Sequence, residues 1–81
     1  MSSSSFDKRY FLLPRSEIGF LRFILEGYDG LAFVRTLDKR NGLVEIAFPG
    51  GRCADVSDVL RALSVEMPLQ EVPAPHPVPP L

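Results

Sequence analysis

The hydrophobic pattern of the first part of the chain predicts a strand followed by a helix. The aromatic and aliphatic run before Pro14 predicts a strand over residues 8–13, because proline cannot donate to the next rung of a sheet. Apolar side chains then recur at spacings of three and four, which predicts a helix over residues 16–28. Ser16 is suited to cap its first turn, and Gly30 to end it in a left-handed conformation. The apolar positions are Ile18, Leu21, Ile24, Leu25 and Tyr28.

The next segment has the pattern of a β-hairpin. Residues 31–37 and 43–48 are rich in aliphatic, β-branched and aromatic side chains. The stretch between them ends in Asn41-Gly42, and an Asn-Gly pair adopts positive φ at low cost. We therefore expect two antiparallel strands joined by a loop of about five residues.

A second helix and a short strand complete the pattern. Apolar spacings of three and four predict a helix over residues 53–65, with Asp55 as its N-cap. Residues 69–72 form a last strand, which Pro73 would end at a sheet edge. The order strand, helix, strand, strand, helix, strand predicts an α+β fold. Its simplest form is the ferredoxin-like two-layer sandwich, a four-stranded antiparallel sheet with both helices on one face.

Two elements carry more apolar surface than one core needs. Phe20 and Phe23 lie off the apolar stripe of the first helix, and both faces of the hairpin, for example at Phe33, carry large apolar groups. Such surface commonly marks association, and a homodimer with Phe20, Phe23 and Phe33 in its interface is the simplest form. The alternative is ordinary exposure, since more than half of a protein surface is apolar.

Length and composition limit the organisation to one domain. The 81 residues are 46% hydrophobic and 23% charged, which is globular usage. We expect a disordered N-terminus over residues 1–7, the folded domain over residues 8–72, and a disordered proline-rich tail over residues 73–81. A formal net charge of −1 provides no positive field for a nucleic-acid backbone, so nucleic acid is not expected as a partner.

Several other classes of function find no support in the sequence. The N-terminus lacks the pattern of a signal peptide and no apolar run could cross a bilayer, so we expect a cytoplasmic protein without membrane contact. Cys53 is the one cysteine and His76 the one histidine, so no metal site or cofactor is expected. No nucleophile and base pattern is visible, and we expect no enzymatic activity.

Residues 16–30 and 31–38 resemble a known family, namely short bacterial proteins described only as a domain of unknown function. Its members share a helix of the form FLKFILE-aYDG followed by a VRTLD strand. The resemblance covers about residues 8–72 and implies an ACT-like variant of the ferredoxin-like fold, without an established activity or catalytic residues. Many ACT domains bind amino acids at a dimer interface, after their first strand. Their usual Asp-x-x-Gly turn is not reproduced at residues 14–19 of this chain.

Three groups of residues are candidates for chemistry. An arginine can clamp a carboxylate and an acid can receive an ammonium group, which would suit an amino-acid-like ligand. This candidate ligand site comprises Arg15, Ser16, Glu26, Asp29 and Arg35. Ion pairs within the fold are the alternative. The second candidate is the loop 49–52, which could bind an anion at the start of a helix or be a plain turn. The third is Cys53 beside this loop, which could be a stabilised thiolate or an ordinary thiol.

The sequence therefore predicts a non-enzymatic, ACT-like domain that self-associates and binds a small ligand such as an amino acid. The alternative is a protein-interaction adaptor. Such an adaptor would offer a sheet edge, or the Pro77-x-x-Pro80 motif of its tail, to a larger partner.

Overall fold

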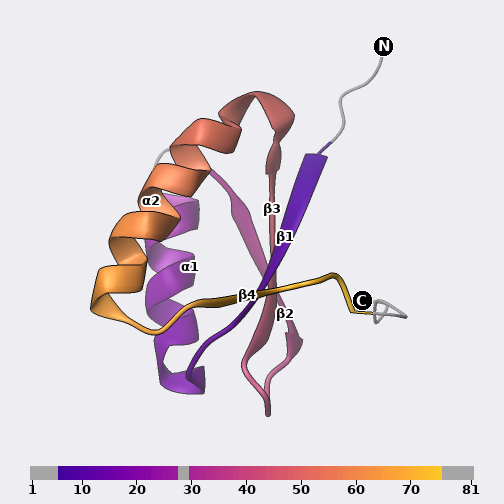
Figure 1. The fold of residues 1–81 in the computed structure, drawn as a ribbon, viewed down its shortest axis with the longest axis vertical. Helices are drawn as coiled ribbons and strands as arrows, with labels where there is room; N and C mark the ends of the chain where they lie inside the picture. The colour runs from indigo at the N-terminus through magenta and orange to yellow at the C-terminus, as the bar shows by residue number, and fades with distance from the viewer. Residues whose placement is uncertain (1–5, 28–29, 76–81) are drawn as a thin grey trace.

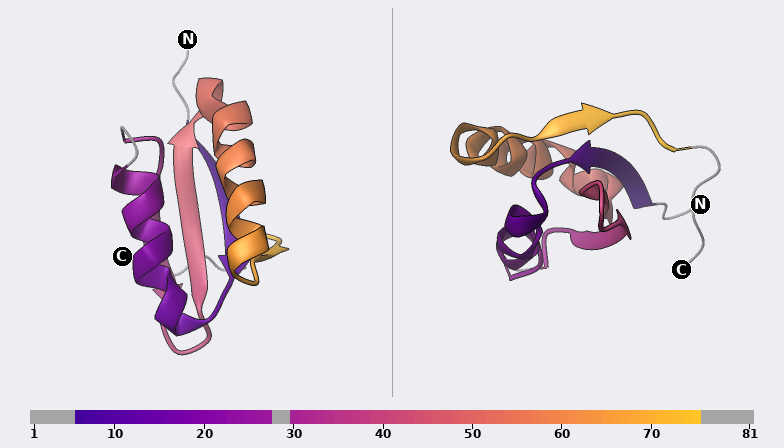
Figure 2. Two further views of the ribbon diagram at one scale, coloured as in Figure 1. Left: turned by 90° about the vertical axis from the view of Figure 1, so that its left-hand side faces the viewer. Right: turned by 90° about the horizontal axis from the view of Figure 1, so that it is seen from below.

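The computed structural model describes residues 6–27 and 30–75, which form two layers. Four antiparallel strands are ordered β2-β3-β1-β4, and both helices cover one face of this sheet (Figure 1, Figure 2). The predicted ferredoxin-like α+β sandwich is confirmed. The strands are β1 (Phe6–Leu12), β2 (Phe33–Asp38), β3 (Leu43–Pro49) and β4 (Gln70–Val72). The helices are α1 (Ile18–Gly27) and α2 (Cys53–Glu66), each entered through a short 3-10 turn, η1 (Arg15–Glu17) and η2 (Gly50–Arg52).

The core lies between the sheet and the two helices. Phe11 on β1 stands opposite Val44 on β3, and Val34 on β2 stands opposite Ile46, so these side chains share the face that the helices cover. The apolar stripe of each helix closes this layer, as the spacing of three and four predicts. The helix residues buried here are Ile18, Leu21, Leu25, Val56, Leu60 and Leu63. We call this helix-covered side of the sheet the inner face and the other side the outer face.

The first strand begins earlier than predicted. β1 starts at Phe6, which pairs with Pro49, so Phe6 and Asp7 belong to the sheet and not to a disordered N-terminus. The expected disorder of residues 1–5 and 76–81 lies outside the described residues. Among the described residues, no helix is both long enough and apolar enough to cross a bilayer.

Neither predicted N-cap acts as one. Ser16 lies inside η1 and makes no capping hydrogen bond; the Glu17 N–H donates to the Pro14 carbonyl instead, at 2.9 Å. Asp55 lies within the first turn of α2 and is held by Arg52, whose Nε is 2.9 Å from its carboxylate. In both places a proline and a 3-10 turn lead the chain into the helix, so a side-chain cap is not required.

The hairpin turn matches its prediction. Gly42 has a φ of 73°, and a Cβ at this position would overlap the carbonyl oxygen of Leu13. The Leu13 N–H donates to the Gly42 carbonyl at 3.0 Å, which fixes this close approach. Asp38 accepts hydrogen bonds from the Asn41 backbone and side chain, and these bonds lower the pKa of the Asp38 carboxyl. Gly30, with a φ of 66°, also adopts the expected left-handed conformation.

Candidate functional site

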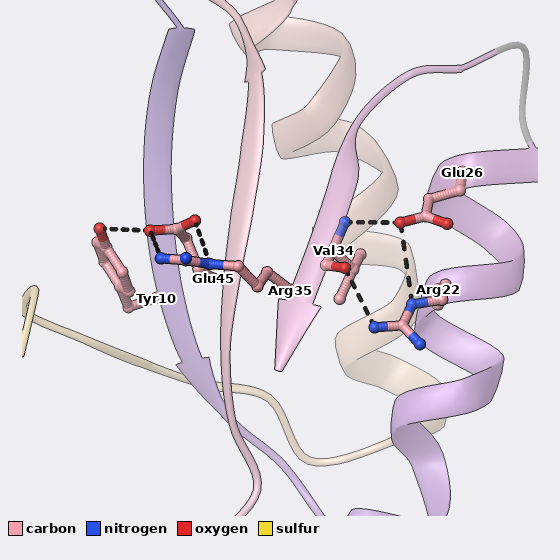
Figure 3. Close-up of polar contacts among 6 residues, drawn as sticks. All are labelled: Tyr10, Arg22, Glu26, Val34, Arg35 and Glu45. Atoms are coloured by element: carbon pink, nitrogen blue, oxygen red, sulfur yellow. Dashed lines mark hydrogen bonds and ion pairs between the residues drawn. The ribbon is translucent and has the colours of Figure 1, made fainter. Parts of the chain in front are cut away.

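Two side chains of α1 occupy the open edge of the sheet. β2 is an edge strand, and at Val34 its backbone groups point away from β3. The Val34 N–H donates to Glu26 Oε2 at 2.9 Å, and Arg22 Nη2 donates to the Val34 carbonyl at 3.2 Å (Figure 3). Arg22 and Glu26, one helical turn apart, also form an ion pair at 3.8 Å. This network satisfies the edge at Val34 and blocks further strand pairing there.

A basic cleft adjoins this network, between the start of α1 and the edge of β2. Its volume is about 550 Å³, within the range of small-molecule sites. Its charged lining residues are Arg15, Arg22, Arg35 and Lys39, and none of the acids in the described part of the chain lines it. Ile18 and Val34 form an apolar part, and Thr36 and Gly19 complete the wall. We call this site the basic cleft.

The outer face of the sheet carries a buried polar network. Glu45 is only 5% exposed, although it lies on the side that no helix covers. Its carboxylate accepts hydrogen bonds from the Tyr10 hydroxyl at 3.0 Å and from Arg35 Nη2 at 3.3 Å (Figure 3). Arg35 Nε lies 3.2 Å from Glu45 Oε1 but is not aligned for a hydrogen bond, so this contact is an ion pair. Burial raises the pKa of Tyr10, and the hydrogen bond to Glu45 raises it further.

Apolar side chains surround that network on the outer face. At one end of the sheet, the rings of Phe6 and Phe33 lie 6.3 Å apart and both are about half exposed. Strand alternation puts further apolar side chains on the same side. These are Leu12, Leu43, Ala47, Pro49 and Val72. The outer face is thus an apolar surface with a neutralised charge pair near its centre.

The structure brings only two of the five predicted ligand residues to one cleft. Arg15 and Arg35 line the basic cleft, but the guanidinium of Arg35 is turned to Glu45 on the outer face. Ser16 is exposed and does not line the cleft, and Glu26 is engaged with the edge of β2. Asp29 lies outside the described residues.

Sequence reasoning missed two of the four charged residues that line the cleft, Arg22 and Lys39. Arg22 has a visible signal, because its spacing of four from Glu26 places both on one side of a helix. Lys39 has no such signal in the sequence, since only the folded hairpin brings it opposite the start of α1.

The predicted interface residues lie on two different surfaces. Phe20 and Phe23 are exposed on α1, in the helical layer, and Phe23 is 71% exposed. Phe33 is 55% exposed and belongs to the outer face of the sheet, on the opposite layer. One two-fold interface therefore does not cover all three residues.

The start of α2 is a second place where the sequence indicated chemistry. Loop residues 49–52 form the end of β3 and the turn η2. The shallow cleft beside this turn includes two acids, Asp55 and Asp58, and Arg52 is paired with Asp55. These acids disfavour the binding of an anion beside the turn. Cys53 is exposed. Among residues 6–27 and 30–75, no three metal-ligating side chains come together.

An ion pair fastens the last strand to the first. The Arg9 guanidinium lies between Glu71, 2.7 Å away, and the Ser57 hydroxyl on α2, 3.0 Å away. The hydrogen bonds between Arg9 and Glu71 lower the pKa of the Glu71 carboxyl and raise that of Arg9. These partners are mutually satisfied on the inner side of β1, where they connect β4 and α2, so we assign this cluster a structural role.

Comparison with known proteins gives a family and no function. No curated protein and no solved structure matches the chain significantly. The model of one family, described as a domain of unknown function (DUF4911), matches residues 11–67. This match runs from the last two residues of β1 to the end of α2, and it includes the basic cleft and, from the polar network of the outer face, Arg35 and Glu45 but not Tyr10. The chain therefore belongs to the DUF4911 family.

Proposed function

We propose that this protein is a non-enzymatic, ACT-like domain that self-associates through the outer face of its sheet. The observation that carries the proposal is the exposed Phe6–Phe33 pair beside the buried Glu45 network. A two-layer sandwich covers only one face of its sheet, and an apolar second face is a common association surface.

The charges of the outer face favour a second copy of the chain as the partner. Glu45 and Arg35 neutralise each other, and Tyr10 occupies a further acceptor position of the carboxylate. Lys8 adds one exposed charge, and its long stem allows the ammonium group to reach solvent at the rim. A nearly neutral, apolar surface places no strong like charges against itself in a two-fold interface.

The size of the outer face sets the expected strength of association. The strands β1 to β4 have seven, six, seven and three residues, and at about 4.8 Å between strands and about 3.4 Å per residue they form a face of about 375 Å². Two such faces bury about 750 Å² in projection, which is below the standard size and is typical of weak, transient interfaces. We therefore expect a dimer that dissociates on dilution.

The adaptor function is the second candidate, and one observation bears on it. The edge of β2 is occupied at Val34 by Arg22 and Glu26, which disfavours strand addition there. β4 pairs with β1 only from Tyr10 to Leu12, so the first half of β1 has no strand on that side among the described residues. This half edge is where an added strand would pair. The Pro77-x-x-Pro80 motif lies outside the described residues.

Sedimentation velocity over a range of concentrations tests the self-association. We expect the wild-type chain to move from monomer to dimer between low and high micromolar concentration. Phe33→Ser removes an aromatic side chain from the outer face and should keep the chain monomeric. Phe23→Ser is the matched control, because Phe23 is at least as exposed but lies on α1.

Circular dichroism should show that both variants remain folded, since both side chains are exposed. A wild-type chain that stays monomeric at every concentration would contradict the proposal. So would a dimer that Phe23→Ser dissociates and Phe33→Ser does not, which would place the interface on α1.

A further inference from the structure

We infer that the basic cleft binds a small dianion, with a phosphate monoester as the closest chemical match, between Arg15 of η1 and Lys39 of the hairpin turn. This inference is independent of self-association, because the cleft lies at the β2 edge and not on the outer face. It rests on the charges that line the cleft, on the backbone at its wall and on its apolar part.

The charges of the cleft are not balanced within the described part of the chain. Of its four cationic residues, Arg22 is paired with Glu26 and Arg35 with Glu45. Arg15 and Lys39 form no ion pair with a described residue. Two positive charges from different elements thus face one cavity, and a single dianion would neutralise both.

The edge of β2 provides a backbone donor for the same anion. Val34 directs its N–H and carbonyl outward, as its bonds to Glu26 and Arg22 show. Backbone groups alternate along a strand, so those of Thr36, two residues on and before the bulge, also point outward. Thr36 lines the cleft, and no side chain of the described residues bonds its backbone as at Val34. The Thr36 N–H can therefore donate to a bound oxygen.

The wall formed by α1 leaves space for a ligand. A Cβ at Gly19 would meet no atom within 4 Å, so this position opens directly onto the cleft. The positive end of the helix dipole lies in the same first turn and adds to the attraction for an anion. Ile18 and Val34 offer an apolar surface to the organic part of the ligand.

The chemistry of the lining distinguishes between classes of ligand. A zwitterionic amino acid needs an acid for its ammonium group, and no acid among residues 6–27 and 30–75 lines this cleft. A phosphate monoester carries a charge of about −1.5 to −2 near neutral pH and several acceptor oxygens, which suits two cations and one N–H. A dicarboxylate has the same charge but spreads it over two groups.

Two-dimensional NMR titration of the full chain at constant ionic strength tests this inference. The probes are phenyl phosphate, inorganic phosphate, succinate and glycine. We expect saturable shifts at Gly19, Thr36 and Lys39 with phenyl phosphate, weaker effects with inorganic phosphate and succinate, and none with glycine. Tighter binding of succinate than of phenyl phosphate would overturn the phosphate assignment.

Two variants and one control localise the binding. Lys39→Gln removes a cation from the cleft. It should lower the affinity for phenyl phosphate by about tenfold, which is the value of one charge-assisted contact. Gly19→Leu should fill the cleft and abolish binding while the helix remains folded. Arg40→Gln changes the net charge equally, but Arg40 does not line the cleft, so it should bind like wild type.

Two results would overturn the inference. One is an absence of saturable shifts with every phosphate probe in a wild-type chain whose spectrum is that of a folded protein. The other is equal weakening by Lys39→Gln and Arg40→Gln, which would show attraction to the overall charge and not binding in the cleft.

Discussion

The two faces of the sheet are built from the same strands but differ in how far they are buried and in their polarity. On the inner face, Phe11 of β1, Val34 of β2 and the alternate residues Val44, Ile46 and Phe48 of β3 are apolar and nearly inaccessible, and helices cover them. On the outer face, the intervening residues form an apolar rim around Tyr10, Glu45 and Arg35. The inner face therefore supplies burial, whereas the outer face combines one satisfied polar network with aromatic rings that stay exposed.

This difference indicates which face is available for function. Substitutions on the inner face should act on folding, because the core is close-packed and complete within one chain. Substitutions at the rim of the outer face should leave folding almost unchanged and act on association. The centre of the outer face lies between these cases, since its charges are buried without a helical cover.

The largest effect should come from removing a large side chain on the inner face. Phe48 is 1% exposed, and we expect Phe48→Ala to lower the free energy of unfolding by about 3–5 kcal/mol, through lost burial and a cavity. Phe33→Ala on the outer face should cost less than about 1 kcal/mol. Urea denaturation of monomeric samples measures both values.

A domain of this size has little stability to lose, so a second variant is needed where Phe48→Ala leaves no folded population to measure. Phe48→Leu is the milder variant and should still be more destabilising than Phe33→Ala. Equal losses for Phe48→Leu and Phe33→Ala would contradict the distinction between the two faces.

An intermediate effect is expected at the centre of the outer face. Arg35→Met keeps an apolar stem but leaves the buried Glu45 carboxylate with Tyr10 alone. Loss of one partner of a buried pair is costly, but the Arg35 side chain is partly exposed, so we expect a loss of about 2 kcal/mol. The double variant Arg35→Met with Glu45→Gln buries no charge and should recover part of this loss.

Urea denaturation of the two single variants and the double variant gives the coupling between the residues. The double variant could lose more free energy of unfolding than the two single variants combined. That result would show that the Glu45 carboxylate does not need Arg35, and that the two residues do not act together.

The fold was predictable because each element has a strong and local signal. The spacing of Ile18, Leu21 and Leu25 by three and four residues identifies α1 without reference to any neighbour. The start of β1 was not predictable in the same way. Phe6 and Asp7 become strand because β3 is long enough to pair with them, and that depends on a partner more than 40 residues away.

The candidate site was predictable only in part, for a related reason. Arg35 is visible in the sequence as a charge within a strand, but alternation alone does not show which face it takes. Its pairing with Glu45 turns it away from the basic cleft. Lys39 enters that cleft only once the hairpin has folded against α1, so no local pattern could identify it.

Within the polar network of the outer face, the smallest effect should come from the hydroxyl of Tyr10. Burial and the bond to Glu45 raise the pKa of Tyr10 above the usual value of about 10. The fold therefore favours the neutral phenol, and its contribution to stability is complete below that usual value and lost as the pH rises through the raised one. We expect part of the tyrosinate absorbance of the wild-type chain to appear late in an alkaline titration. Tyr10→Phe should remove this late phase and cost about 1 kcal/mol, because it deletes one hydrogen bond and leaves Glu45 paired with Arg35. A wild-type titration that matches the variant after scaling for one tyrosine fewer would show that the outer face does not enclose this hydroxyl.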